Sequence, residues 1–138
     1  MNRQEFCELM AQAKKRSGIG TKELSLRIQQ PPTIIRRFER GLNNFNLAKV
    51  VEYLQVINSK LVVCNSEETI SFYDYEHIIE WVKKTRTGKY SQRALADAIG
   101  CSFVHVAHFE SKKSILSIDI FLRIIELFGY SISIITNG

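Results

Sequence analysis

Cys101, His105 and His108 have a spacing at which side chains can bind a metal ion. They lie four and three residues apart, so a helix would bring them to one face. Thiolate and imidazole groups at such spacings are ligands in many zinc sites. No fourth ligand accompanies them, and Cys101 falls where the apolar pattern expects a core residue. We therefore predict structural roles for these residues, with no metal site and no cofactor.

Two glutamates, Glu39 and Glu110, each follow a phenylalanine and would need a second group beside them to act in catalysis. The sequence contains no GxSxG, HExxH or phosphate-binding-loop motif and no paired acids. We expect both glutamates to stabilise the fold, and we expect no catalytic residues, so the protein is not predicted to be an enzyme.

The adjacent residues Arg36 and Arg37 supply a binding chemistry. A guanidinium group can bond guanine O6 and N7, or a phosphate, through two hydrogen bonds at once. The formal net charge is +5, and residues 1–66 hold 11 Lys/Arg and 5 Asp/Glu whereas residues 67–138 hold 8 and 9. The basic first half indicates an anionic partner.

Composition predicts a folded intracellular protein. Hydrophobic residues make up 45% of the 138 positions, enough for a packed core, and the three cysteines are too widely spaced for a zinc motif. We expect reduced thiols, no signal peptide and a cytoplasmic location. The most apolar segment, 118–135, is interrupted by charged residues, so we expect no membrane partner.

The sequence repeats itself at an offset of 71 positions. Few identities survive, but the apolar pattern does. Matched positions include Leu24 with Leu95, Ile28 with Ile99, Ile35 with Val106, Phe38 with Phe109, and Leu61 with Ile132. We therefore predict two small domains, 1–66 and 67–138, joined by a short polar linker at 65–69.

Each half is predicted to be mainly α-helical and to end in one short β-strand. Helical periodicity and capping residues predict four helices in each half. They are expected at about 2–16, 21–28, 32–39 and 47–57, and again at about 74–87, 92–99, 103–110 and 118–128. Strands are expected at 60–64 and 131–136, and 70–75 is a candidate to join their sheet.

The segment 91–110 carries the clearest motif. Leu95 and Ile99 share the inner face of the first of its two helices, and Ala96 lets the helices cross closely. Gly100 suits the left-handed turn between them, and Ser102 is a suitable N-cap for the second. This segment resembles the Cro/CI-type helix-turn-helix family, also called XRE-like or lambda-repressor-like.

The first half fits the same pattern but departs from it at the turn. Gln29 stands in place of the glycine and Gln30 in place of an apolar residue. Pro31 and Pro32 stand where the second copy has its capping serine. Pro32 suits the first turn of a helix, where its missing N–H costs nothing. The resemblance therefore covers nearly the whole chain as two tandem copies, with a degenerate turn in the first copy.

The resemblance implies a sequence-specific DNA-binding transcriptional regulator. In this family the second motif helix enters the major groove of double-stranded DNA and the first contacts the phosphate backbone. Carried over by position, Thr21 and Gln92 would reach phosphates, and Asn43, with Asn44, and Lys112, with Lys113, would contact the backbone after each recognition helix. Base-facing positions would be Pro32, Thr33, Arg36 and Arg37 in the first copy, and Phe103, Val104, His105, Ala107 and His108 in the second.

The resemblance also implies a role for the two glutamates. In the family, this position pairs with a basic residue of the first helix, and Lys14 is suitably placed for Glu39. In the second copy the matching slot holds Thr85, so Lys84 or Arg86 would have to pair with Glu110.

Two kinds of assembly follow from the resemblance. The strands at 60–64 and 131–136 are expected to pair within the chain as a pseudo-dimer, or their edges could pair between chains in a homodimer. An alternative function is that of a protein-interaction module such as an antitoxin that binds a toxin protein. The apolar residues Phe103 and Val104 favour this alternative, because they are unusual on a DNA-binding surface.

Overall fold

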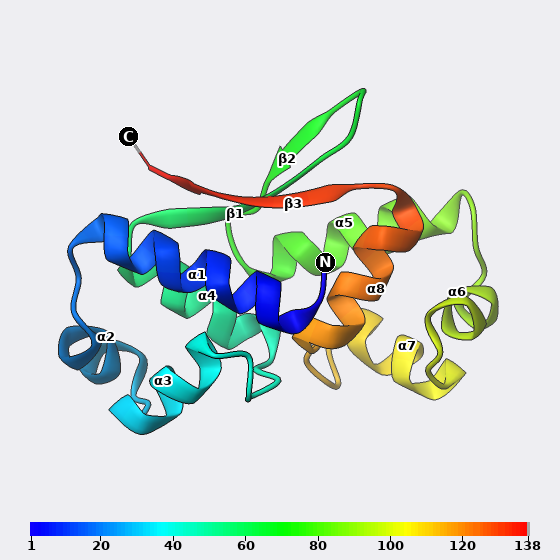
Figure 1. The fold of residues 1–138 in the computed structure, drawn as a ribbon. Helices are drawn as coiled ribbons and strands as arrows, with labels where there is room; N and C mark the ends of the chain where they lie inside the picture. The colour runs from blue at the N-terminus through cyan, green and yellow to red at the C-terminus, as the bar shows by residue number, and fades with distance from the viewer. Residues whose placement is uncertain (138) are drawn as a thin grey trace.

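The structure is a computed structural model that describes residues 1–137, and its elements repeat in order (Figure 1). The first set consists of α1 (Arg3–Ser17), α2 (Thr21–Ile28), α3 (Pro32–Glu39), α4 (Leu47–Val56) and β1 (Ser59–Cys64). After β2 (Thr69–Ser71), the second set consists of α5 (Tyr75–Thr87), α6 (Gln92–Ile99), α7 (Phe103–Glu110), α8 (Ile118–Phe128) and β3 (Ser131–Thr136). The eight helices and two terminal strands predicted from the sequence are therefore present within about two residues.

Short polar side chains fix where most helices begin. Asn2 caps α1 in a reciprocal capping box with Glu5, and Asp74 caps α5 by accepting from the backbone N–H of His77. Ser91 and Ser102 cap α6 and α7, as expected. Each such bond satisfies an N–H group that the helix itself leaves without a partner.

The two terminal strands pair, which confirms the prediction made for them. The sheet has the order β2-β1-β3, and β1 and β3 run antiparallel with Leu61 opposite Ile134 and Val63 opposite Ile132. The pairing leaves β3 at one edge of the sheet. Of the predicted strand at 70–75, only Ile70 and Ser71 belong to β2, and Tyr75 is the first residue of α5.

Matching residues of the two halves meet at two places. Val62 pairs with Ser133 in the sheet, and Asn46 forms an isolated bridge with Ser117; in both pairs the residue numbers differ by 71. Reciprocal bonds flank the bridge, from Leu47 N–H to the Leu116 carbonyl at 2.8 Å and from Ile118 N–H to the Phe45 carbonyl at 3.1 Å. These reciprocal contacts define an approximate two-fold axis that relates the two halves.

The halves share one hydrophobic core, although the sequence predicts two small domains. Buried side chains form a single cluster across both halves, and α1 of the first half packs along β3 of the second. Arg3 also bridges the halves by bonding the Gly41 carbonyl and the Asp119 carboxylate, each at 3.1 Å. The two sets of helices therefore hold a fixed relative position.

The polar stretch at 65–69 does not act as a linker between separate domains. Asn65 accepts hydrogen bonds from the N–H groups of Glu67 and Glu68, and its own N–H donates to the Glu68 carbonyl at 3.0 Å. This bonding closes a tight turn between β1 and β2. Polar turn residues suit both a linker and a hairpin, and the pairing of β2 with β1 selects the hairpin.

The three cysteines differ in burial, and we expect their reactivity to differ accordingly. Cys7 is fully buried, and burial raises the pKa of its thiol to about 12, whereas Cys64 is partly exposed on β1. At pH 8 a thiol reagent should therefore modify Cys64 readily and leave Cys7 unmodified until the protein unfolds. Mass spectrometry of the labelled peptides, with and without denaturant, measures this. Labelling of Cys7 as fast as Cys64 in the native protein would contradict the packing described.

Within residues 1–137, no helix combines the length and the apolar character needed to cross a membrane.

Candidate nucleic-acid interface

The turns between α2 and α3 and between α6 and α7 have the same geometry. Gly100 adopts the left-handed conformation with φ of 72°, as predicted, and Gln29 adopts it at the matching position with φ of 56°. The N–H of Gln30 donates to the Ser25 carbonyl at 3.2 Å, and the N–H of Cys101 donates to the Ala96 carbonyl at 3.0 Å. The first turn is therefore retained although its sequence lacks the glycine.

Each pair of helices buries one face and leaves the other in solvent. The residues predicted to point inward are all buried: Leu24, Ile28, Ile35 and Phe38 in the first pair, and Leu95, Ala96, Ile99, Val106 and Phe109 in the second. Burial of these side chains fixes the rotation of α3 and α7 about their axes, and so decides which residues face outward.

The outer face of α3 is polar and basic. Pro32, Thr33, Arg36 and Arg37 are exposed, and Pro32 occupies the first helical position as expected. Within residues 1–137 neither arginine forms a salt bridge. Both guanidinium groups are therefore available to a ligand outside the chain.

The outer face of α7 is mostly apolar. Phe103 is 37% exposed and Val104 54%, and His108 is also exposed. His105 and Ala107 are only half-buried, and the His105 ring packs edge-on against Phe109 with centroids 6.0 Å apart. His105 thus lies at the margin of the face rather than on it.

Sequence reasoning missed Arg93. Its guanidinium carbon lies 4.5 Å from the centre of the Phe103 ring, a cation–π contact that places a positive charge on the α7 face. Arg93 is the second residue of α6, and Lys22 occupies the matching position of α2. The recurrence of a basic residue at one position of both repeats was the signal that could have found it.

A half-buried ion pair ties α3 to α1. The Lys14 ammonium lies 2.8 Å from the Glu39 carboxylate, as expected, and also donates to the Thr21 hydroxyl at 2.8 Å. The Tyr53 hydroxyl donates to Glu39 at 2.7 Å. Burial, followed by this hydrogen bond to an anion, raises the pKa of Tyr53 far above its usual range, so that its hydroxyl remains a donor.

A stronger version of this network ties α7 to α5. Arg86 binds Glu110 through two hydrogen bonds, at 2.6 and 2.9 Å, and bonds the Tyr90 carbonyl at 3.0 Å. The side chains are 11% and 2% exposed. Of the two candidates named for this pairing, Arg86 is therefore the partner.

The capping residues Asn2 and Asp74 are 72 positions apart, whereas the other matching residues are 71 apart. The first helices of the two halves are therefore offset by one residue from the rest of the repeat.

The two residues predicted to contact phosphates belong to these networks. Thr21 accepts from Lys14, and the amide of Gln92 donates one of its two N–H groups to Glu110 at 2.9 Å. Both residues are half-buried, at the first position of α2 and of α6. The networks thus connect the end of α3 to the beginning of α2, and the end of α7 to the beginning of α6.

The segments after α3 and α7 turn through a left-handed residue, Gly41 with φ of 75° and Lys112 with φ of 67°. A Cβ atom on Gly41 would lie 2.8 Å from the Gln4 Cα, so only glycine fits there. Lys112 is exposed, with its ammonium 3.6 Å from Glu76. Asn43 is half-buried, and its neighbour Asn44 accepts from the Asp119 N–H at 3.2 Å, which engages Asn44 across the two halves.

The helices α3 and α7 lie on the same side of the molecule, one in each half, with α2 and α6 at its two ends and the sheet on the opposite side (Figure 1). This arrangement follows from the two-fold relation of the halves. The basic outer face of α3 and the mostly apolar outer face of α7 therefore belong to the same side of the molecule.

In residues 1–137 no group of three or more His, Cys, Asp or Glu side chains is placed to hold a metal ion.

A search of curated proteins and a search of solved structures both find no match to this chain. Residues 82–135, which run from the middle of α5 through the α6–α7 motif and α8 into β3, match the helix-turn-helix family model HTH_3.

Proposed function

We propose that the chain is a sequence-specific DNA-binding transcriptional regulator that acts as a single-chain pseudo-dimer of two helix-turn-helix units. The observation that carries the proposal is that α3 and α7 protrude on one side from two halves locked together by β1, β3 and the Asn46–Ser117 bridge. Dimeric proteins of this class place their recognition helices in successive major grooves about 34 Å apart. One chain would then read two half-sites of one duplex.

The side chains exposed on α3 and α7 differ in the contacts that they can make with DNA bases. Arg36 and Arg37 can bond guanines in one half-site, whereas Phe103 and Val104 can contact only apolar groups such as a thymine methyl in the other. The basic first half would supply most of the attraction to phosphate. The proposed operator is therefore asymmetric, with a guanine-containing half-site and a thymine-containing one.

The proposal predicts that one chain binds one duplex without prior association. Selection from random double-stranded DNA, followed by titration of the enriched site, should give a 1:1 complex by light scattering. The binding curve should show no dependence on protein self-association, and the affinity should fall steeply as salt rises. A complex with two chains per site, or no enriched sequence at low salt, would contradict this assignment.

The exposed apolar surface of α7 supports a second candidate, a protein-binding module such as an antitoxin. Phe103 and Val104, with Arg93 over the Phe103 ring, combine the features of a protein-binding hot spot. Replacing Phe103 and Val104 together with serine separates the candidates. Weaker DNA binding with loss of preference in one half-site supports the regulator, and unchanged DNA binding supports the protein-binding role.

A further inference from the structure

Two hollows of the surface occupy matching positions in the two halves. One, the α8 hollow, lies between α8 and β3, and six of its lining residues are Leu122, Ile125, Glu126, Tyr130, Ser131 and Ile132. The other, the α4 hollow, lies between α4 and β1. Its lining includes the residues 71 positions earlier, namely Val51, Leu54, Gln55, Ser59, Lys60 and Leu61. The two hollows differ in size, at about 130 Å³ for the α4 hollow and about 280 Å³ for the α8 hollow.

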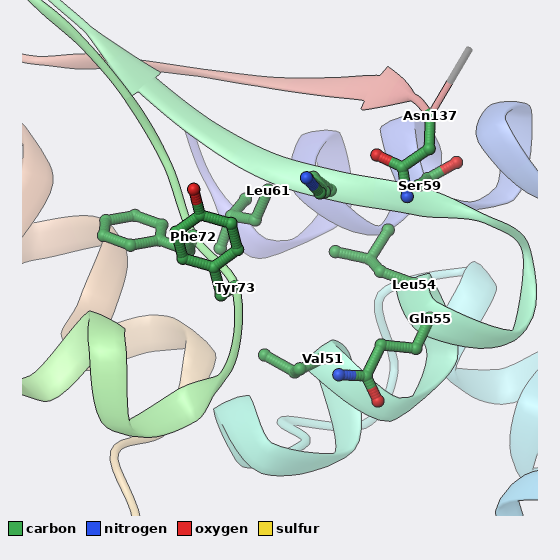
Figure 2. Close-up of a pocket in the computed structure, with 9 residues that line it drawn as sticks. Val51, Leu54, Gln55, Ser59, Leu61, Phe72, Tyr73 and Asn137 are labelled. Atoms are coloured by element: carbon green, nitrogen blue, oxygen red, sulfur yellow. The ribbon is translucent and has the colours of Figure 1, made fainter.

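The α4 hollow is partly filled by the segment that follows β2. Phe72 and Tyr73 form one wall of it, opposite Val51 and Leu54 of α4 (Figure 2). Phe72 is 4% exposed, and its N–H donates to the Leu61 carbonyl at 3.0 Å, extending the pairing in which Ile70 lies opposite Val63. An aliphatic residue and an aromatic residue two positions later thus complete this half.

The α8 hollow is lined differently. Because Asn2 and Asp74 cap matching helices, Met1 corresponds to Tyr73, and Met1 lines this hollow. Among residues 1–137, no strand takes the place that β2 has in the other half, and β3 is an edge strand of the sheet. Tyr130 lines the α8 hollow where Ser59 lines the α4 hollow, and among residues 1–137 no counterpart of Phe72 lines it.

The backbone of β3 points its hydrogen-bonding groups toward this open edge. The bond from Phe72 to Leu61 shows that the peptide groups of Leu61 face β2 and not β3. In an antiparallel ladder, residues whose peptide groups face away from the neighbouring strand recur at every second position. The residue opposite such a residue also directs its own peptide groups away from the pair. Ile134, opposite Leu61, and Ile132, opposite Val63, therefore direct their N–H and C=O groups outward.

Exposure agrees with an uncovered edge. Val62, Val63 and Cys64 of β1 pair with β2, and the first two are 3% and 0% exposed. The matching residues Ser133 and Ile134 are half-buried, and Ile135 is 45% exposed. Nothing charged and no proline protects β3, although exposed edge strands usually carry such residues.

We propose that the edge of β3 and the α8 hollow bind an extended segment of a partner protein that carries an aliphatic residue and, two positions later, an aromatic residue. The aliphatic residue would pair with Ile134, as Ile70 does with Val63, and the aromatic residue with Ile132, as Phe72 does with Leu61. The aromatic ring enters the α8 hollow, and main-chain bonds to β3 supply the rest of the affinity. This site lies on the sheet side, away from α3 and α7, so it is independent of the proposed DNA binding.

The chain itself provides the probe. A fluorescein-labelled synthetic peptide with the sequence of residues 67–73 is titrated with the full chain, and backbone NMR shifts locate the contact. The expected result is saturable binding with shifts at Ile132 and Ile134, unchanged by added duplex DNA. Absence of saturation up to about 1 mM, or shifts at Leu61 and Val63 instead, would overturn the proposal.

A pair of N-methylated peptides gives the matched control. Methylation of the Phe72 nitrogen removes the N–H that would donate to the Ile132 carbonyl, and we expect affinity to fall at least about tenfold. Methylation of the Ser71 nitrogen, whose N–H faces away from the strand, should change affinity by less than about twofold. Equal losses for both peptides would refute strand pairing. Self-association of the chain through β3 without peptide binding would identify a second copy as the occupant and also refute the proposal.

Discussion

Replacing Arg36 and Arg37 together with alanine should lower the affinity for the selected DNA site by at least about a hundredfold. Each guanidinium group can make a two-point contact with guanine, worth about 1–3 kcal/mol of discrimination, and each is exposed without an ion-pair partner within residues 1–137. The loss should be concentrated in one half-site, because α7 carries no equivalent residues. Fluorescence anisotropy with the wild-type site and with guanine substitutions in either half measures both effects.

The matched control is the replacement of Lys83 and Lys84 with alanine. It removes the same formal charge from exposed positions of α5, outside α3 and α7. If the effect of the arginines is only electrostatic, the two double variants will lose similar affinity and the arginine variant will keep its sequence preference. That outcome would contradict base recognition by α3.

Replacing Glu110 with alanine should destabilise the protein by about 3–5 kcal/mol. The change leaves the Arg86 guanidinium in a site where its side chain is 11% exposed, with only the Tyr90 carbonyl to bond it. Removal of one member of a buried ion pair costs this much because the remaining charge is desolvated without compensation. Urea unfolding followed by circular dichroism measures the loss.

Two further variants test the cause of that loss. Glu52 forms an ion pair with Lys49 in which the side chains are 46% and 30% exposed, so replacing Glu52 with alanine should cost less than about 1 kcal/mol. The double replacement of Arg86 and Glu110 with methionine should be less harmful than the single change at Glu110, because no buried charge is left unpaired. A double variant as unstable as the single one would show that packing, and not charge, is responsible.

The helices and turns could be predicted from sequence because their causes are local. The serines before α6 and α7 cap the helices through bonds three residues away, and the turn at Gly100 requires only that one residue adopt a positive φ. The turn at Gln29 shows the limit of such signals. The packed helices on either side impose the left-handed conformation there, although the sequence does not favour it.

The features that the sequence did not predict depend on contacts between distant residues. The polar stretch at 65–69 has the composition of a linker, and only the pairing of β2 with β1 makes it a hairpin turn. The apolar pattern shows which residues are buried but not that the two halves share one core. The contact of Arg93 with Phe103 links α6 to α7, and neither residue alone indicates it.

The one-residue shift between the first helices of the two halves shows how a repeat can mislead. An ungapped offset of 71 placed Thr85 opposite Lys14, and the ion pair in the structure uses Arg86. Helix position is set by the cap and the buried face. The span from the N-cap of the first helix to the start of the second is one residue shorter in the second half, from Asp74 to Gln92, than in the first, from Asn2 to Thr21. The cation therefore moves by one position in the sequence and still lies beside the matching glutamate.

The internal pairing of β1 with β3 has a consequence for how this molecule can change over time. In a homodimer, one codon specifies the same residue in both subunits, so any substitution alters both contacts with the ligand together. Here α3 and α7 are encoded separately while the strands hold them in place. Either helix can therefore diverge without altering its counterpart, and the arginines of α3 and the apolar residues of α7 are an instance of that freedom.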